Sequence, residues 1–482
     1  MALAPFLFML SWPRPGRLGW VHGFASWMTG LYWIVPTLQT YGGMPLLLGV
    51  ALTGVLAAYL GLFHAVFAWL GSRMWRRWGA VRLLIVLPAL WVALEWARTY
   101  LGGGFPWNLA GYAWVDVPGA LPLSSWIGPY GISFLVLLTS AAVALSIARR
   151  RWEPAVVGLL VPLFLLPLAG RWSVRRAEAD VREAGSFGRP VRLLQPNIPN
   201  LVSFDAAAVA RNYRKVIDQS LDSCQPGSLV IWPESAAWPF LYGRDPRLDE
   251  DLKSLVDRGC TVLFNSSHPT GESFYNSAFL LSASGPVARY DKRHLVPFGE
   301  YVPFRGVFGW MDKLARNAGE FRAADETTLL PWGGDQIGMA ICYEVVFPSE
   351  VAELVRNGAT MLVTITNDAW YGDTSAPWQH FRAARFRAAE NRRPLLRAAI
   401  TGVSAFVGPD GSVRAQIGVF REGVIRARVL GEKGLTPYAR VPWLVPALCS
   451  VIAVIAVIAI IAIAAIAAPE VFAVYFARRS PS

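Results

Sequence analysis

Long apolar segments occupy both ends of the chain, and a more polar region with short apolar runs separates them. A helix needs about 20 apolar residues to cross a bilayer, and six segments reach or approach that length. The pattern therefore predicts a polytopic α-helical membrane domain, with five of the segments before the polar region and one after it. The six segments are residues 20–38, 44–70, 83–100, 126–148, 154–170 and 441–467.

The first eleven residues are also apolar, but they are too few to span a bilayer. They lack the charged start and the small-residue cleavage site of a signal peptide. We therefore expect them to be part of a truncated helix.

The region between residues 189 and 430 alternates short β-rich runs with helical stretches. This alternation predicts a layered α/β domain. We expect helices over 205–223, 247–258 and 378–393. The predicted strands are 191–195, 228–232, 261–265, 278–282, 336–341, 360–366 and 398–407.

Composition supports a membrane protein. The chain has 482 residues, of which 54% are hydrophobic and 16% are charged, and its formal net charge is +12. Soluble domains contain more charge and less apolar sequence. Because no zinc-finger, helix-turn-helix or RNA-binding motif accompanies the basic charge, we expect no nucleic-acid partner.

The basic residues gather in four clusters between and beside the apolar segments. They lie at 14–17, 73–82, 149–151 and 478–479. If all four face the cytoplasm, as the positive-inside rule predicts, every segment alternates in direction without conflict. The region 171–440 then lies on the outer side of the membrane.

Four cysteines are present, and none has the C-x-x-C spacing of a metal or redox motif. The five histidines form no H-E-x-x-H pattern, so the sequence predicts neither a metal nor a cofactor. Cys449 falls within an apolar segment. Whether Cys224 and Cys260 pair stays open from the sequence alone.

Three reactive side chains each follow the end of a predicted strand. Cys342 ends the apolar run 337–341, Glu234 follows Val-Ile-Trp-Pro, and Lys292 lies in Tyr-Asp-Lys-Arg-His. A thiol, a candidate base and a candidate oxyanion-stabilising charge suggest acyl transfer through a thioester. Taken singly, each has an ordinary alternative: an inert core thiol, a helix-capping carboxylate and a surface lysine.

Two further segments have open interpretations. Residues 367–372, which include Trp370, follow an apolar strand and form either a simple turn or a wall of the active-site cleft. The aromatic residues after Lys292 have too few polar neighbours for an ordinary surface loop. These aromatic residues form either part of a hydrophobic core or a lid that contacts the membrane interface and admits acyl chains. These residues are Phe298, Tyr301, Phe304, Phe308 and Trp310.

Several segments together resemble the apolipoprotein N-acyltransferases, the membrane-embedded branch of the nitrilase superfamily. Ile-Trp-Pro-Glu-Ser at 231–235, the lysine segment at 292–303 and Ala-Ile-Cys-Tyr-Glu at 340–344 resemble the family's base, lysine and nucleophile segments. Further similar segments are 195–199, 275–277, 367–372, 377–381 and 434–440 in the polar region, and 41–45 and 104–107 near the membrane.

The resemblance implies a nitrilase-like α-β-β-α sandwich and a role for each reactive residue. Cys342 would attack the sn-1 ester of a phospholipid, and Glu234 would take the thiol proton. Lys292 and the backbone amide of Tyr343 would hold the oxyanion. The thioester would then pass its acyl chain to the α-amino group of a diacylglyceryl-cysteine on an apolipoprotein.

Supporting residues also follow from the resemblance. Glu300 and Glu344 match acidic positions that would orient Lys292 and the loops, and Asn276 matches a supporting position. Family members often carry a Trp where this chain has Phe204, so we expect Phe204 to line the substrate wall. Members usually have eight membrane helices, and residue 1 falls within what resembles the second.

The expected organisation has six parts: membrane helices in 1–170, a linker at 171–188, a periplasmic catalytic domain in 189–430, a linker at 431–440, a C-terminal membrane helix at 441–467 and a cytoplasmic tail at 468–482. We expect a monomer in the bacterial inner membrane. Phospholipid would be the acyl donor and apolipoprotein the acceptor. The alternative is a membrane-tethered amidase that uses the same three residues with water as the acceptor.

Overall fold

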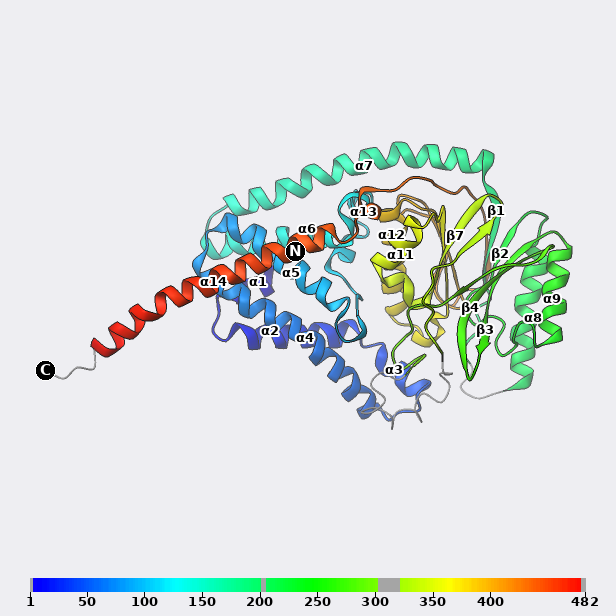
Figure 1. Cartoon of the computed structure of the whole chain (residues 1–482), viewed down its shortest axis with the longest axis horizontal. Coiled ribbons are helices and arrows are strands. Elements are labelled where there is room, and N and C mark those ends of the chain that lie inside the picture. Colours follow the sequence, from blue (N-terminus) through cyan, green and yellow to red (C-terminus); the bar gives the residue numbers. More distant parts are fainter. Residues whose placement is uncertain (1–2, 201–204, 302–320, 478–482) are drawn as a thin grey trace.

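The computed structural model describes residues 3–200, 205–301 and 321–477. A bundle of apolar helices forms one part, and two sheets with flanking helices form the other (Figure 1). Helix α7 (Glu153–Phe187) runs from the bundle to the first strand, so the expected linker at 171–188 is helical as far as Phe187.

Five helices are long and apolar enough to cross a membrane, within the part of the chain that the structure describes. They pack through a core that also contains the short helix α1 (Ala4–Phe8). The five are α4 (Leu46–Arg77), α5 (Ala80–Arg98), α6 (Ala120–Arg149), the first part of α7 (Glu153–Arg171) and residues Leu444–Ile463 of α14 (Leu444–Ala477).

The predicted segment 20–38 is divided into two helices, α2 (Pro15–Gly30) and α3 (Ile34–Thr40). The 16 residues of α2 extend about 24 Å, less than the hydrocarbon core of about 30 Å. In a continuous helix the Gly30 carbonyl would accept the N–H of the next turn, but here it accepts the side-chain amide of Gln379 at 3.1 Å. A contact with the α/β domain therefore replaces the helical bond.

The α/β domain consists of two six-stranded sheets packed face to face. One has the strand order β12-β1-β2-β3-β4-β5, and the other has the order β11-β10-β9-β8-β7-β6. The first contains β1 (Arg189–Gln195), β2 (Leu229–Ile231), β3 (Thr261–Thr270), β4 (Ser273–Ser282), β5 (Gly285–Asp291) and β12 (Gly423–Val429). The second contains β6 (Leu329–Trp332), β7 (Asp335–Ile341), β8 (Met361–Thr366), β9 (Leu395–Ala399), β10 (Ser404–Val407) and β11 (Val413–Ile417).

A layer of helices covers the outer face of each sheet, as the α-β-β-α prediction requires. Helices α8 (Ala206–Ser223) and α9 (Pro246–Asp257) pack on the first sheet through a separate apolar cluster. Helices α11 (Pro348–Arg356) and α12 (Ala376–Asn391) cover the second sheet. The apolar core on this side continues without a break into the membrane helices. The short helix α13 (Pro437–Arg440) leads from the domain to α14.

The predicted single strand 398–407 is wrong, because β9 ends at Ala399 and β10 begins at Ser404, antiparallel to it. The chain reverses at residues 400–403. A Cβ atom on Gly402 would lie 2.1 Å from Asp368 Oδ2, so only glycine permits this approach. The other predicted strands and helices correspond to observed elements, with shifts at their ends.

The structure answers the question about Cys224 and Cys260, which form a disulfide with their Cα atoms 6.0 Å apart. The bond joins the end of α8 to the residue just before β3. Cys342 and Cys449 are free and buried.

Candidate active site

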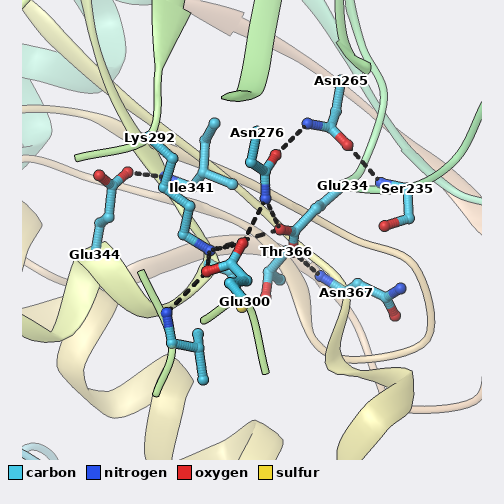
Figure 2. Close-up of polar contacts among 12 residues, drawn as sticks. Glu234, Ser235, Asn265, Asn276, Lys292, Glu300, Ile341, Glu344, Thr366 and Asn367 are labelled. Atoms are coloured by element: carbon cyan, nitrogen blue, oxygen red, sulfur yellow. Dashed lines mark hydrogen bonds and ion pairs between the residues drawn. The ribbon is translucent and has the colours of Figure 1, made fainter. Parts of the chain in front are cut away.

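The three predicted reactive residues each follow the end of a strand, and they meet between the two sheets. Glu234 comes three residues after β2, and Lys292 comes directly after β5 of the same sheet. Cys342 comes directly after β7 of the facing sheet. All three side chains are buried. Figure 2 shows Lys292, Glu234 and their polar neighbours converging from different strands.

Cys342 lies at a sharp turn from strand to helix. Its φ angle is +52°, a left-handed conformation that non-glycine residues seldom adopt, and it is the first residue of the 3₁₀ turn η5 (Cys342–Val346). Strain of this kind concentrates at functional sites. Burial and the nearby Glu234 carboxylate raise the pKa of the thiol, and Lys292 opposes this effect only in part. The resting thiol is therefore protonated.

Lys292 lies between two carboxylates. Its Nζ atom is 2.9 Å from Glu300 and 3.8 Å from Glu234 Oε1. Burial alone would lower the pKa of Lys292, but these two carboxylates outweigh it and raise the pKa. The amine therefore stays charged, as an oxyanion-stabilising group must.

Glu234 is held at both carboxylate oxygens. Asn276 donates to Oε1 at 2.9 Å, and the backbone N–H of Asn367 donates to Oε2 at 2.9 Å. Burial raises the pKa of Glu234 and the nearby Glu300 adds to this, whereas Lys292 lowers it. A raised pKa makes the carboxylate a stronger base toward the thiol.

Asn276 joins the two carboxylates. Its amide nitrogen also donates to Glu300 Oε1 at 2.8 Å, and its oxygen accepts from Asn265 at 2.7 Å. Asn265 in turn accepts from the backbone N–H of Ser235 at 2.9 Å. Figure 2 shows this chain of amides from Asn265 through Asn276 to Glu234 and Glu300.

Glu344 connects the nucleophile turn to the lysine segment. Its Oε2 accepts from the backbone N–H of Ile341 at 2.7 Å. Its Oε1 accepts from the Tyr290 hydroxyl at 2.9 Å and from the backbone N–H groups of Arg293 and His294 at 2.7 and 3.1 Å. One carboxylate therefore fixes the spacing between the residues that precede Cys342 and those that follow Lys292.

Of the predicted wall and lid residues, Trp370 contacts the membrane part of the chain. The Trp370 carbonyl accepts from Thr37 of α3 at 2.9 Å, and its ring contacts that of Tyr41. Phe298 is partly exposed, and its N–H donates to the Tyr301 carbonyl at 2.7 Å. The other predicted wall and lid residues lie outside the described residues: Phe204, Phe304, Phe308 and Trp310.

A buried polar group behind Cys342 was not predicted as a unit. It consists of Asp368, His380 and Arg397, none of which is exposed to solvent. Arg397 interrupts the apolar run Leu-Leu-Arg-Ala-Ala of β9. A charge inside such a strand is the signal that the sequence offered, because a buried charge requires partners.

Within the described ranges, no three His, Cys, Asp or Glu side chains are grouped so that they could bind a metal ion. The site instead combines a thiol, a base and a fixed positive charge within a sandwich of two sheets. This fold, with these side chains brought together, is that of the nitrilase class of enzymes.

Comparison with known families agrees with that class and refines it. Residues 191–432 match the carbon-nitrogen hydrolase family, and residues 1–142 match the apolipoprotein N-acyltransferase N-terminal domain. An amidase from Nesterenkonia sp. is 22% identical, covering 53% of this chain and 93% of its own, with a TM-score of 0.40. A branch 10 member of the nitrilase superfamily from Saccharomyces cerevisiae is 18% identical, covering 50% and 89%, with a TM-score of 0.40.

Two relatives extend over nearly the whole chain. The apolipoprotein N-acyltransferase of Geobacter metallireducens is 36% identical over 472 residues, which are 94% of this chain and 89% of the relative. That of Ralstonia nicotianae is 35% identical over 458 residues, which are 91% and 82%. The chain belongs to the apolipoprotein N-acyltransferase family of the nitrilase superfamily, and it is a multi-pass membrane protein.

Proposed function

We propose that the chain transfers the sn-1 acyl chain of a phospholipid, through a thioester on Cys342, to the α-amino group of a diacylglyceryl-cysteine on an apolipoprotein. The observation that carries this proposal is the placement of Lys292, with its amine between Glu234 and Glu300 and its charge retained. A buried, charged amine beside a thiol and a base has the composition of an oxyanion site for acyl transfer.

In the first half-reaction Glu234 takes the thiol proton as the sulfur attacks the ester carbonyl. The raised pKa of Cys342 means that little thiolate exists beforehand, so proton transfer accompanies attack. Lys292 and the backbone N–H of Tyr343 stabilise the oxyanion. When the intermediate collapses, the C–O bond breaks, and the leaving lysophospholipid oxygen takes the proton from Glu234.

The second half-reaction reverses these roles. The amine attacks the thioester carbonyl, the same two donors hold the oxyanion, and the C–S bond breaks. Glu234 receives a proton from the amine, and the departing sulfur regains one. The products are the amide and the free Cys342 thiol, so no oxidant or cofactor is needed.

The membrane helices favour lipid substrates over the alternative amidase reaction. Helices α11 and α12 of the catalytic domain share one apolar core with α5 and α6. A cleft fixed to a membrane bundle needs only a lateral encounter with substrates that carry acyl chains. Soluble amides would gain nothing from this arrangement.

We place the catalytic domain on the periplasmic side of the inner membrane. Three of the basic clusters, at 73–82, 149–151 and 478–479, support this orientation, because the five spans put all three on one side of the membrane and the positive-inside rule assigns that side to the cytoplasm. The Cys224–Cys260 disulfide adds independent support, because structural disulfides persist in the periplasm and are rare in the cytosol.

Mass spectrometry of the protein after incubation with phospholipid tests the proposal. Wild type should carry one acyl group on Cys342, and Cys342→Ala should carry none and should transfer none. Cys449→Ala is the matched control, because Cys449 is the other free, buried thiol but lies in α14. Acyl transfer by Cys342→Ala, or ammonia release without lysophospholipid by wild type, would contradict the proposal.

A further inference from the structure

A histidine behind the nucleophile contacts the peptide group that follows it. His380 of α12 lies with its Nε2 atom 3.0 Å from the carbonyl oxygen of Cys342. That carbonyl belongs to the same peptide unit as the backbone N–H of Tyr343. In a trans peptide the C=O and N–H bonds point in opposite directions. A partner that fixes one of them therefore fixes the other.

The N–H of Tyr343 is free of the turn that contains it. Tyr343 is the second residue of η5, and the first N–H groups of such a turn have no acceptor within it. Among the described residues this N–H has no acceptor outside the turn either, so it can donate to a substrate oxygen.

The contacts of His380 determine which ring nitrogen carries the proton. Its Nδ1 lies 3.1 Å from Nη2 of Arg397 and 3.2 Å from Oδ1 of Asp368. Arg397 can only donate and the ionised Asp368 can only accept, so the contacts at Nδ1 fit either state of that nitrogen. At Nε2 the partner is the Cys342 carbonyl, which can only accept, so Nε2 carries a proton. Burial and the Arg397 charge lower the pKa of His380, which favours the neutral ring, although Asp368 opposes them. The Nε2 proton then points at the Cys342 carbonyl.

The membrane part of the chain holds the ring from one side. Trp107 stacks on His380 with ring centroids 5.7 Å apart and planes inclined by 26°. The Trp107 indole N–H donates to Gln379, the neighbour of His380, at 2.6 Å, and Arg98 binds the Trp107 carbonyl at 2.9 Å. His380 is therefore fixed from both domains.

We propose that His380 is a positioning residue for the oxyanion site. Its Nε2–H orients and polarises the Cys342–Tyr343 peptide, so that the Tyr343 N–H points at the developing oxyanion and donates more strongly. Hydrogen bonds in such chains reinforce one another. This inference rests on the proposed function, because it assumes that the Tyr343 N–H holds the oxyanion.

Two amide variants test whether a hydrogen-bond donor must extend as far as the Cys342 carbonyl. In His380→Gln the side-chain amide extends to about the position of Nε2 and can still donate to the Cys342 carbonyl. In His380→Asn the amide stops near the position of Nδ1 and cannot. Each variant is compared in acylation by a phospholipid, which needs the oxyanion site, and in alkylation of Cys342 by iodoacetamide, which does not.

We expect both variants to alkylate within about threefold of wild type, because the thiol itself keeps its surroundings. We expect His380→Asn to acylate on the order of 100-fold more slowly, as after loss of an oxyanion donor, and His380→Gln to recover about tenfold of that loss. Equal acylation by the two variants, or an equal fall in acylation and alkylation, would overturn the inference.

A measurement on wild type does not depend on how well the variants fold. The ¹⁵N shifts of His380 should show a neutral ring protonated at Nε2 near neutral pH. A ring protonated only at Nδ1 has no proton for the Cys342 carbonyl and would refute the inference. If wild type forms no acyl-enzyme at all, the proposed function itself fails. If wild type acylates normally and His380→Asn does also, only the role of His380 fails.

Discussion

Asp368→Asn should destabilise the catalytic domain far more than loss of a surface carboxylate. Arg397 Nη2 donates to Asp368 Oδ2 at 2.7 Å, and neither side chain is exposed. Removing one partner of a buried pair leaves the other charge uncompensated, at a cost of about 3–5 kcal/mol. For a domain of this size each kcal/mol lowers Tm by about 2–4 °C, so we expect a fall of about 6–20 °C.

The control is Asp257→Asn, which breaks an exposed pair with Lys253 on α9. Exposed pairs contribute less than about 1 kcal/mol, so its Tm should stay within a few degrees of wild type. Thermal unfolding of the purified proteins in one detergent, followed by circular dichroism, measures both. A Tm for Asp368→Asn equal to that of Asp257→Asn would refute the reasoning.

The pH dependence provides a second check on the same pair. Burial raises the pKa of Asp368, but Arg397 and the neighbouring donors outweigh it and lower the pKa from 3.8 to about 2. A carboxyl with a lowered pKa stabilises the fold fully above pH 4 and loses that contribution as the pH falls toward 2. The Tm difference between wild type and Asp368→Asn should therefore be smaller at pH 3 than at pH 7. A difference that grows on acidification would show that the carboxylate is not stabilised as the geometry implies.

The remaining predictions concern the reaction and the orientation. Lys292→Met should form the acyl-enzyme about 100- to 1,000-fold more slowly, since it removes one oxyanion donor, and single-turnover acylation measures this. Glu234→Gln should also acylate far more slowly, because an amide cannot accept the thiol proton; acylation at the wild-type rate would exclude Glu234 as the base. A Cβ atom at Gly79 or Gly185 meets no neighbour within 4 Å, so a cysteine fits at either position. In intact cells a membrane-impermeant maleimide should label Gly185→Cys and not Gly79→Cys, and the opposite result would reverse the topology.

The positions of Glu234 and Cys342 were predictable because each follows an apolar strand, and a polar side chain there has few places to lie except the edge of the sheet. Lys292 follows β5, a strand of mixed polarity, so the pattern alone gave a weaker signal for it. What the strands do not encode is which sheet each joins. The prediction that the residues after β2 and β5 lie close to the residue after β7 rested on the family resemblance and not on the spacing of the strands.

The polar residues behind the site were harder to predict, because their partners are distant in sequence. Asp368, His380 and Arg397 come from three different elements, and Asn265 reaches Glu234 only through Asn276. Helix ends have the same difficulty. The apolar run 20–38 gives no indication that the helix ends at Gly30. There the side-chain amide of Gln379, about 350 residues later, donates to the Gly30 carbonyl in place of a backbone N–H of the next turn.

The unbroken core between α11, α12 and the membrane bundle has a consequence for biogenesis. Helices α11 and α12 cover the outer face of the second sheet, and they in turn pack against the membrane helices. Helix α14, which follows the catalytic domain in the chain, packs against α5, which precedes it. Synthesis therefore delivers the catalytic domain before the bundle that supports it is closed. A ribosome-bound chain that stops before α14 should expose apolar surface to chaperones and proteases, and the enzyme should become active only after α14 has entered the membrane.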